Sequence, residues 1–137
     1  MADLTVTATG VLAASGAGKA RGTAGGTITA GQPLYIDSSD SNKLKPCDAD
    51  ASAAAAACVG IALHGAASGQ PIEYQQSGDI NPGATVTVGE SYYVSDTAGG
   101  IKPAADLVSG DYVTFLGVGT TASNIKLGLL VSGVAVP

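Results

Sequence analysis

The single histidine of the sequence, His64, lies six positions after Cys58, and these two side chains are the pair that could supply a nucleophile and its base. A thiol or hydroxyl nucleophile needs such a base beside it, oriented by a third group. His64 falls within IALHGAAS at the predicted end of a strand, and no motif supplies the third group. We therefore interpret His64 as a strand-end polar residue, and we expect the protein not to be an enzyme.

A metal site also lacks the residues that it would require. Asp48, Asp50 and Ser52 have the first spacings of a calcium loop, but Ala53 stands where the loop requires Gly and Val59 where it requires a bidentate acid. One histidine and two cysteines fall short of a zinc site without carboxylates. We expect Asp50 or Ser52 to cap a short helix instead, and we predict no metal.

The segment Gly117–Ala122 (GVGTTA) matches the start of a dinucleotide-binding fingerprint, GxGxx[GA]. That fingerprint opens a helix and is followed by an acidic residue about 20 positions further on. Here another strand is predicted next, and no acidic residue follows Asp111. The sequence therefore predicts no bound cofactor.

Charge excludes a further class of function. The chain has 137 residues, a formal net charge of −5 and only six lysine and arginine residues, which are scattered. A nucleic-acid partner would require a basic stripe that neutralises phosphates. Lys19 and Arg21 are too few for this, and we interpret them either as a solvated pair or as a contact with an acidic partner surface.

Two segments of the sequence bear on the cellular compartment in which the protein resides. The start, MADLTVTATG, carries an acid where a signal peptide would have a basic region, and the run Ala51–Leu63 is far shorter than a membrane span. We expect a protein made and kept in a cytosol, without a membrane partner. Cys47 and Cys58 would then be reduced and would behave as small hydrophobic residues.

Alternating apolar residues predict a mainly β fold, a small sandwich or barrel of short strands. In the first strand Leu4 and Val6 share one side. One short Ala-rich helix is expected at Asp48–Ala57 (DADASAAAAA). The expected strands are Leu4–Thr9, Thr27–Asp37 in two pieces broken by Gly31, Val59–His64, Pro71–Gln76, Thr85–Val88, Ser91–Ser95, Asp111–Val118 and Asn124–Val131.

A Gly-rich segment separates the first strand from the remaining ones. Val11–Gly26 (VLAASGAGKARGTAGG) contains five Gly and no large apolar side chain after Leu12, so its backbone is costly to order. We expect residues 1–26 to form a strand followed by an extended N-terminal arm or long loop that is ordered by contacts outside itself. Residues 27–137 would then form the β domain.

That β domain reads as a duplicated motif, with halves at 27–80 and 81–137. The alignment places Tyr35 on Tyr93 and Lys45 near Lys102, and it continues into the stretch Val59–Gly78. There Gly60 falls on Gly117, while Ile72, Tyr74, Ser77 and Gly78 fall on Leu127, Leu129, Ser132 and Gly133. Within Pro71–Gln76, we expect Ile72 and Tyr74 to face inward and Glu73 and Gln75 to face outward.

Several segments resemble a family of small head proteins of tailed bacteriophages, the capsid decoration or cement proteins. These segments are Val59–Gly78, SYYVSDTAGGI at Ser91–Ile101, SGDYVTFLGV at Ser109–Val118, and the starts MADLTVTA and ARGTAGGTITAGQPLYID. The resemblance implies a β-rich subunit, commonly a homotrimer, on the outside of an icosahedral head at three-fold and quasi-three-fold positions. It would bridge neighbouring major capsid proteins of the virion.

We accordingly expect a structural subunit made in the host bacterial cytoplasm, with the major capsid protein and copies of itself as partners. Its contacts with the capsid or with other subunits would include Leu4, Val6, Lys19 and Arg21, carried by an arm that extends along the shell. An alternative is a receptor- or glycan-binding β module of a tail fibre or spike. Such a module would stack sugars on exposed aromatic rings, for which Tyr92, Tyr93 and Tyr112 are the candidates.

Overall fold

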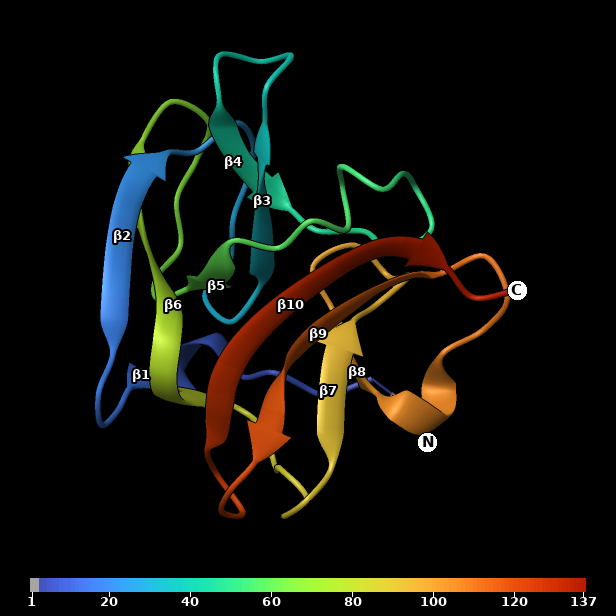
Figure 1. Cartoon of the computed structure of the whole chain (residues 1–137). Helices are drawn as coiled ribbons and strands as arrows, with labels where there is room; N and C mark the ends of the chain where they lie inside the picture. Colours follow the sequence, from blue (N-terminus) through green and yellow to red (C-terminus); the bar gives the residue numbers. More distant parts are fainter. Residues whose placement is uncertain (1–2) are drawn as a thin grey trace.

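The computed structural model describes residues 3–137, and within this range the protein is built from β-strands and two short 3-10 turns (Figure 1). The strands form one ten-stranded sheet that curls into half of a barrel. The strands are β1 (Val11–Ala13), β2 (Gly18–Thr23), β3 (Pro33–Asp37), β4 (Lys43–Pro46), β5 (Gly60–Ala62), β6 (Pro71–Pro82), β7 (Ser91–Val94), β8 (Ile101–Pro103), β9 (Tyr112–Gly119) and β10 (Ile125–Ala135), and the turns are η1 (Ala8–Gly10) and η2 (Ala104–Asp106). The prediction of a mainly β fold is confirmed.

The longest strand, β6, lies at the centre of the sheet because it pairs along both of its edges. Gln75 lies opposite Ile61 of β5 on one side and Lys19 of β2 on the other. Further along, Ser77 lies opposite Gly128 of β10 on one side and opposite β2 on the other. β5 and β10 therefore share one edge of β6, while β2 and β1 cover the opposite edge.

The two halves of the duplicated motif form matching sets of strands. The sheet order β4-β3-β5-β6-β10-β9-β7-β8 reads the same from either end when the halves are exchanged. The hairpin β3–β4 places Tyr35 opposite Lys45, and the hairpin β7–β8 places Tyr93 opposite Lys102. The two lysines, which the alignment places near each other, therefore occupy the same register position in the two hairpins.

The last strands of the two halves, β6 and β10, match each other in a register that differs from the predicted one. Ala62 of β5 pairs with Tyr74, and Gly119, which occupies the same place in β9, pairs with Ile125. Tyr74 therefore matches Ile125, and the predicted match with Leu129 is wrong. The segment 120–124 between β9 and β10 is shorter than the segment 63–70 between β5 and β6. Because strand patterns repeat every two residues, a shift by an even number of residues leaves the same faces apolar.

The apolar core divides into two clusters, and neighbouring residues of β5 contribute to both, Ala62 to the smaller cluster and Ile61 to the larger one. The smaller cluster lies under β2 to β6 and is formed by Ala24, Ile28, Leu34, Leu44, Ala62, Ala66, Ile72 and Tyr74. The larger cluster is formed by Val11, Ala30, Cys47, Ala49, Cys58, Ile61, Ile80, Val86, Tyr92, Val94, Ile101, Leu116, Ile125 and Leu127. The inward orientation predicted for Ile72 and Tyr74 is confirmed.

Gln75 was expected to face outward, and this expectation is wrong. It is fully buried, directly after the buried Tyr74, because both faces of β6 are covered here: Tyr74 belongs to the smaller core cluster, while Gln75 lies opposite Ile61, which is buried in the larger cluster. A bulge in the pairing of β6 with β2 follows directly after Gln75. Its side-chain Nε2 donates to the carbonyl oxygens of Ser77 and Asp79, at 2.9 and 2.8 Å. The side chain thus bonds to the kinked backbone of its own strand.

The predicted first strand, Leu4–Thr9, does not form. The backbone N–H of Leu4 donates to the carbonyl of Ile101 at 2.8 Å, and that of Thr7 donates to Gly83 at 2.7 Å, but no ladder continues from these bonds. The chain then enters η1 (Ala8–Gly10). The two acceptors, Ile101 and Gly83, belong to segments about 20 residues apart in the sequence, so no single strand pairs with Leu4–Thr9.

The Gly-rich segment is not an arm that extends away from the body, so this prediction is also wrong. β1 and β2 run antiparallel to β6 along most of its length, from Val11 opposite Pro82 to Thr23 opposite Pro71. Backbone hydrogen bonds order this segment without large side chains, since each residue of a ladder offers its own donor and acceptor. The glycines permit close approach: a Cβ at Gly18 would lie 2.3 Å from the Ser77 hydroxyl.

The predicted Ala-rich helix at Asp48–Ala57 is replaced by irregular turns, so this prediction is wrong. One helix-like bond is present, from the Ala56 N–H to the Ser52 carbonyl at 3.1 Å. The neighbouring backbone bonds elsewhere: the Ala49 N–H donates to Ser95, and the Ala56 carbonyl accepts from the Thr114 hydroxyl. Ten residues gain little from helix propensity alone, so these tertiary bonds decide the conformation.

Smaller differences concern short strands. Thr27–Ala30 contributes a single bridge, from Ile28 to Ala66, and Thr85–Val88 pairs with no strand among residues 3–137. β4 and β8 were not predicted as strands. No helix in the described range is long and apolar enough to cross a membrane.

Two glycines with almost the same backbone conformation test whether the N-terminal segment is docked on β6. Gly78 has φ of +81° and Gly89 has φ of +82°, so alanine is strained at both, by about 1–2 kcal/mol. A Cβ at Gly78 would also lie 2.3 Å from the Gly16 carbonyl oxygen, whereas none of the described atoms lies within 4 Å of a Cβ at Gly89. We expect Gly78→Ala to lower the free energy of unfolding by about 1–3 kcal/mol more than Gly89→Ala does. Urea denaturation measures both variants, and equal losses would contradict the docking of residues 11–23.

Candidate interaction surface

The C-terminal half of β10 is an edge strand with exposed apolar side chains. Gly128 is the last residue of β10 that pairs with β6. Residues 129–135 pair only with β9 within the described chain. Leu130 and Val134 are each 65% exposed and Val131 is 43% exposed. No charged residue follows Lys126. An edge of this kind offers unpaired backbone donors and acceptors to another chain, and charged residues usually protect such an edge.

Aromatic side chains extend this surface across the outer face of β9 and β7. Leu130 lies opposite Phe115, which in turn lies opposite Tyr93. The rings of Tyr93 and Phe115 pack edge to face, with their centroids 5.7 Å apart and their planes at 70°. Both are half-buried. Together with the edge of β10, this outer face forms an apolar surface, the β10 edge surface, defined by Tyr93, Phe115, Leu130, Val131 and Val134. Of these, Val131 lies opposite the buried Thr114 and therefore points to the other face of the same edge.

The four residues predicted as contacts lie elsewhere and are not brought together. Leu4 and Val6 are half-buried and pack against the larger core cluster of their own chain. Lys19 and Arg21 are exposed on β2, along the edge of β6 that faces away from β10. Arg21 keeps 82% of its side chain exposed and forms an ion pair with Glu73, Nε to Oε2 at 3.3 Å.

His64 lies beside an open pocket but both of its ring nitrogens are engaged. The pocket is lined by Arg21, His64, Pro71, Ile72 and Glu73. The His64 Nε2 accepts from the Glu73 backbone N–H at 3.1 Å, and the Nδ1 lies 2.9 Å from the Gly65 carbonyl. These bonds connect the two ends of the β5–β6 loop.

Cys58 does not line this pocket. It packs with Cys47 in the larger core cluster, and its Sγ contacts the Gly60 carbonyl at 3.3 Å. Both cysteines are buried and free, as expected for small hydrophobic residues. Burial, together with the nearby Cys58 thiol, raises the pKa of the Cys47 thiol, so the reactive thiolate is disfavoured.

The segment with calcium-loop spacings bonds to itself. Asp48 accepts from the Asp50 backbone N–H at 3.3 Å, and Ser52 accepts from the Ala55 N–H at 3.1 Å. A hydrogen bond with the Asp48 carboxyl, with a contribution from its charge, raises the pKa of Asp50. Among residues 3–137, no group of three or more His, Cys, Asp or Glu side chains could hold a metal ion.

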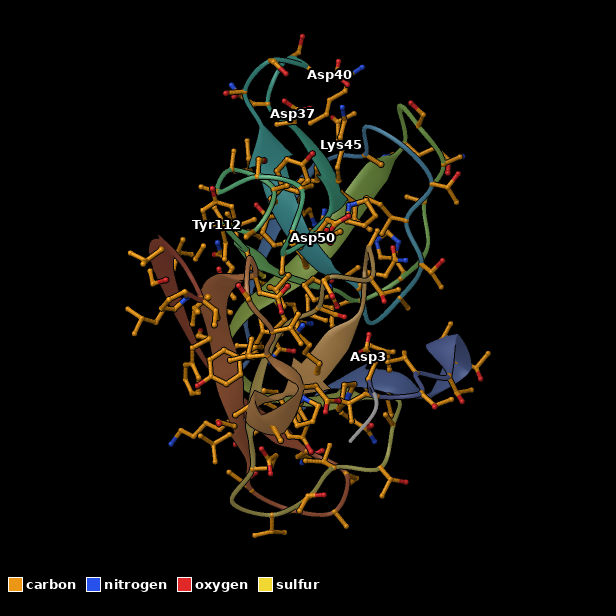
Figure 2. All side chains as sticks on the ribbon, turned by 90° about the vertical axis from the view of Figure 1, so that its right-hand side faces the viewer. Asp3, Asp37, Asp40, Lys45, Asp50 and Tyr112 are labelled. Carbon is orange, nitrogen blue, oxygen red and sulfur yellow. The ribbon has the colours of Figure 1, made fainter. Side chains whose placement is uncertain are left out.

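The equivalent lysines of the two halves, Lys45 and Lys102, each bind two carboxylates. Lys45 lies near the tip of the β3–β4 hairpin, with its Nζ 2.7 Å from the Asp37 Oδ2 and 3.1 Å from the Asp40 Oδ2, and Figure 2 shows the three side chains gathered there. Side-chain hydrogen bonds with Asp37 and Asp40 raise the pKa of Lys45. Hydrogen bonds from Lys45 and Ser39 lower the pKa of Asp37 to about 2.

Lys102 occupies the same register position as Lys45 but is buried. Its Nζ contacts the Oδ2 of Asp111, which is also buried, and lies 3.2 Å from the Oδ1 of the partly exposed Asp96. Burial lowers the pKa of Lys102, but the hydrogen bonds with Asp111 and Asp96 outweigh burial, so the pKa is raised overall.

The three tyrosines proposed for sugar stacking differ in exposure. Tyr92 is 1% exposed, and its hydroxyl accepts from the Thr87 N–H at 2.9 Å, so it belongs to the core. Tyr93 and Tyr112 are half-buried, and Tyr112 lies on the side of the molecule that Figure 2 presents. Tyr93 packs against Phe115 within the β10 edge surface.

The β10 edge surface was not identified from the sequence. One signal was present: after Lys126 the chain has no charge while it remains rich in Leu and Val. That composition favours a strand but does not tell whether both edges of the strand are paired. The pairing depends on where β6 changes its partner from β10 to β5.

Comparison with known proteins gives no relative from which a function could be transferred. No family model matches the chain, and neither a curated protein nor a solved structure matches it significantly. The geometry above therefore stands as the basis for a functional proposal.

The Asp37–Lys45 pair predicts a pH dependence of stability. Because the folded pKa of Asp37 is about 2, below the value of about 3.9 for an unperturbed aspartate, the pair stabilises the fold above pH 4 or so. This contribution is lost as the pH falls through the folded pKa. We expect Asp37→Asn to lower the melting temperature near neutral pH, and the difference from the wild type to vanish as the pH approaches about 2.

A second variant, Lys45→Met, provides the control. In the Lys45→Met background the substitution Asp37→Asn should have a smaller effect, because the interaction between the two side chains is already absent. Thermal unfolding followed by circular dichroism measures all four proteins. A difference between wild type and Asp37→Asn that persists unchanged at the lowest pH would contradict the assignment.

Proposed function

We propose that the protein is a structural virion subunit, a decoration or cement protein bound to the outside of a tailed-bacteriophage head. It would occupy three-fold and quasi-three-fold positions as a homotrimer and stabilise the lattice of the major capsid protein. The sequence resemblance supports this proposal. The observation that carries it furthest in the structure is the β10 edge surface, an uncharged strand edge with three exposed apolar side chains.

This surface fits a role in association. A strand edge supplies backbone hydrogen bonds to an added strand, and its apolar side chains supply the buried area that a stable contact requires. Soluble monomers seldom leave such patches open. The predicted contact residues Leu4 and Val6 serve the chain's own core instead, so the proposed contact moves from the N-terminal segment to β10.

The first prediction of this proposal concerns self-association. Leu130→Asp and Val134→Asp each place a charge on the β10 edge surface, and both side chains are 65% exposed in the single chain. Folding stability should therefore change by no more than about 0.5 kcal/mol. We expect the trimer to dissociate at protein concentrations at least about tenfold higher than those at which the wild type dissociates. Analytical ultracentrifugation measures this shift.

Val88 offers a matched control because it is also 65% exposed and lies before β7, in a turn that is not part of the β10 edge surface. Val88→Asp adds the same charge, so it should leave association unchanged. A wild-type protein that stays monomeric at all concentrations, or three variants that behave alike, would argue against the β10 edge surface as the subunit contact.

The second prediction concerns the virion. A cement subunit should be present in hundreds of copies on the outer surface of the head, at the three-fold and quasi-three-fold positions. An electron-microscopy map of intact particles, with gel quantification against the major capsid protein, determines both position and copy number. A few copies at the tail would instead favour the receptor- or glycan-binding module, for which Tyr93 and Tyr112 would then be the candidates.

A further inference from the structure

Lys102 and Asp111 form a buried ion pair whose surroundings are unusual for two opposite charges. Lys102 is on β8 and Asp111 directly precedes β9, and the two side chains are 2% and 1% exposed. The Lys102 Nζ contacts the Asp111 Oδ2 and lies 3.2 Å from the Asp96 Oδ1. The side-chain nitrogen of Lys102 is thus in contact with two carboxyl groups, those of Asp111 and Asp96.

The Asp111 carboxylate is incompletely satisfied in this arrangement. Its Oδ2 accepts from the Val108 N–H at 3.1 Å as well as from Lys102, but the buried Oδ1 has no hydrogen-bond partner within the described chain. A buried carboxylate without donors on both oxygens is costly, because the charge has lost its water. A neutral group at this place would remove that cost.

We propose that Lys102 and Asp111 become joined by an isopeptide bond between the Lys102 Nζ and the Asp111 Cγ, with Asp96 as the catalytic group that transfers the proton. The product is an amide cross-link between β8 and the start of β9. It closes a ring around η2 and the segment that follows it.

The reaction is a condensation that needs no further reactant. A proton passes from the Lys102 ammonium to the Asp111 carboxylate, which leaves a neutral amine and a neutral carboxylic acid. The lone pair of Nζ attacks Cγ and forms the C–N bond, while the electron pair of the C=O bond moves to oxygen. Asp96 accepts a proton from Nζ and returns it to the departing hydroxyl, the C–O bond breaks and one water leaves. The amide N–H then donates to Asp96.

The backbone holds the two reacting groups together. Lys102 is fixed by its pairing with Tyr93, while the backbone of Asp111 bonds to Val108 and Val136 at 3.1 and 2.8 Å. Such restraint replaces an encounter in solution and raises the effective concentration of the amine. Burial favours the neutral forms and keeps water away, which favours condensation over hydrolysis. The ammonium form of Lys102 is the resting state, so the proton transfer limits the rate and the bond forms after folding.

The other half of the protein supplies an internal comparison. Lys45 holds the position of Lys102, and its Nζ lies 2.7 Å from the Asp37 Oδ2 and 3.1 Å from the Asp40 Oδ2. These side chains are 19–42% exposed, so water can satisfy their charges and is present at high concentration. The same three groups should therefore remain an ordinary ion pair there.

Intact-mass spectrometry of the denatured wild-type protein tests the proposal. We expect a mass lower by one water than the sequence requires, with conversion increasing during several days of incubation after purification. Chymotrypsin cleaves after Leu107 and would separate Lys102 from Asp111, so a joined pair of peptides locates the bond. A folded wild-type protein that keeps its full mass, both fresh and after incubation, overturns the proposal, as does a bond located at Lys45.

Three variants sharpen the result. Asp111→Asn should give the same final mass as the wild type, because the amide forms with loss of ammonia instead of water. Lys102→Arg keeps the charge but has no amine that can attack, so it should keep its full mass. Asp96→Asn leaves Lys102 and Asp111 in place but cannot shuttle the proton, and it should also keep its full mass. Condensation in Lys102→Arg would overturn the bond assignment, and condensation in Asp96→Asn would overturn the role of Asp96.

Discussion

Backbone pairing along β6 is the constraint on which the rest of the structure depends. This strand has a partner on each edge over most of its length, and it changes partner from β5 to β10 near Ser77. The change of partner divides the core into two clusters and leaves the C-terminal half of β10 without a neighbour on one side. The buried core of the subunit and its exposed edge therefore have the same cause.

The two hairpins β3–β4 and β7–β8 have the same register and different electrostatic surroundings. In β3–β4 the lysine and its carboxylates lie near a solvated tip, where the charges are screened and the pair adds a modest pH-dependent stability. In β7–β8 the corresponding lysine is buried together with Asp111. The same residue types are thus solvated in one half and buried in the other, and only in the buried half is one carboxylate oxygen left without a donor.

The strands with clear alternation, such as those around Ile72 and Tyr92, could be predicted from the sequence because their periodicity depends on local residues. The hairpin alignment of Lys45 with Lys102 was accessible for the same reason. The fate of Val11–Gly26 was not, since its ladder depends on a strand some 50 residues away and its own side chains carry little signal. The burial of Gln75 follows from the larger core cluster, which covers its face of β6, and the unpaired edge of β10 follows from a change of strand partner; neither has a local pattern. The residues proposed to react, Lys102 and Asp111, are ordinary surface types whose burial is decided by tertiary packing.

The docking of the N-terminal segment on β6 also sets an order for folding during synthesis. Residues 11–23 emerge from the ribosome before their ladder partner, residues 71–82, and the other edge of that partner pairs only once residues 125–128 have been made. Such distant pairings are slow to form, and the edges involved stay open meanwhile. The sheet can close only after residues 125–128 have been released, and until then the glycine-rich segment 11–23 has few apolar groups that could bind to a wrong partner.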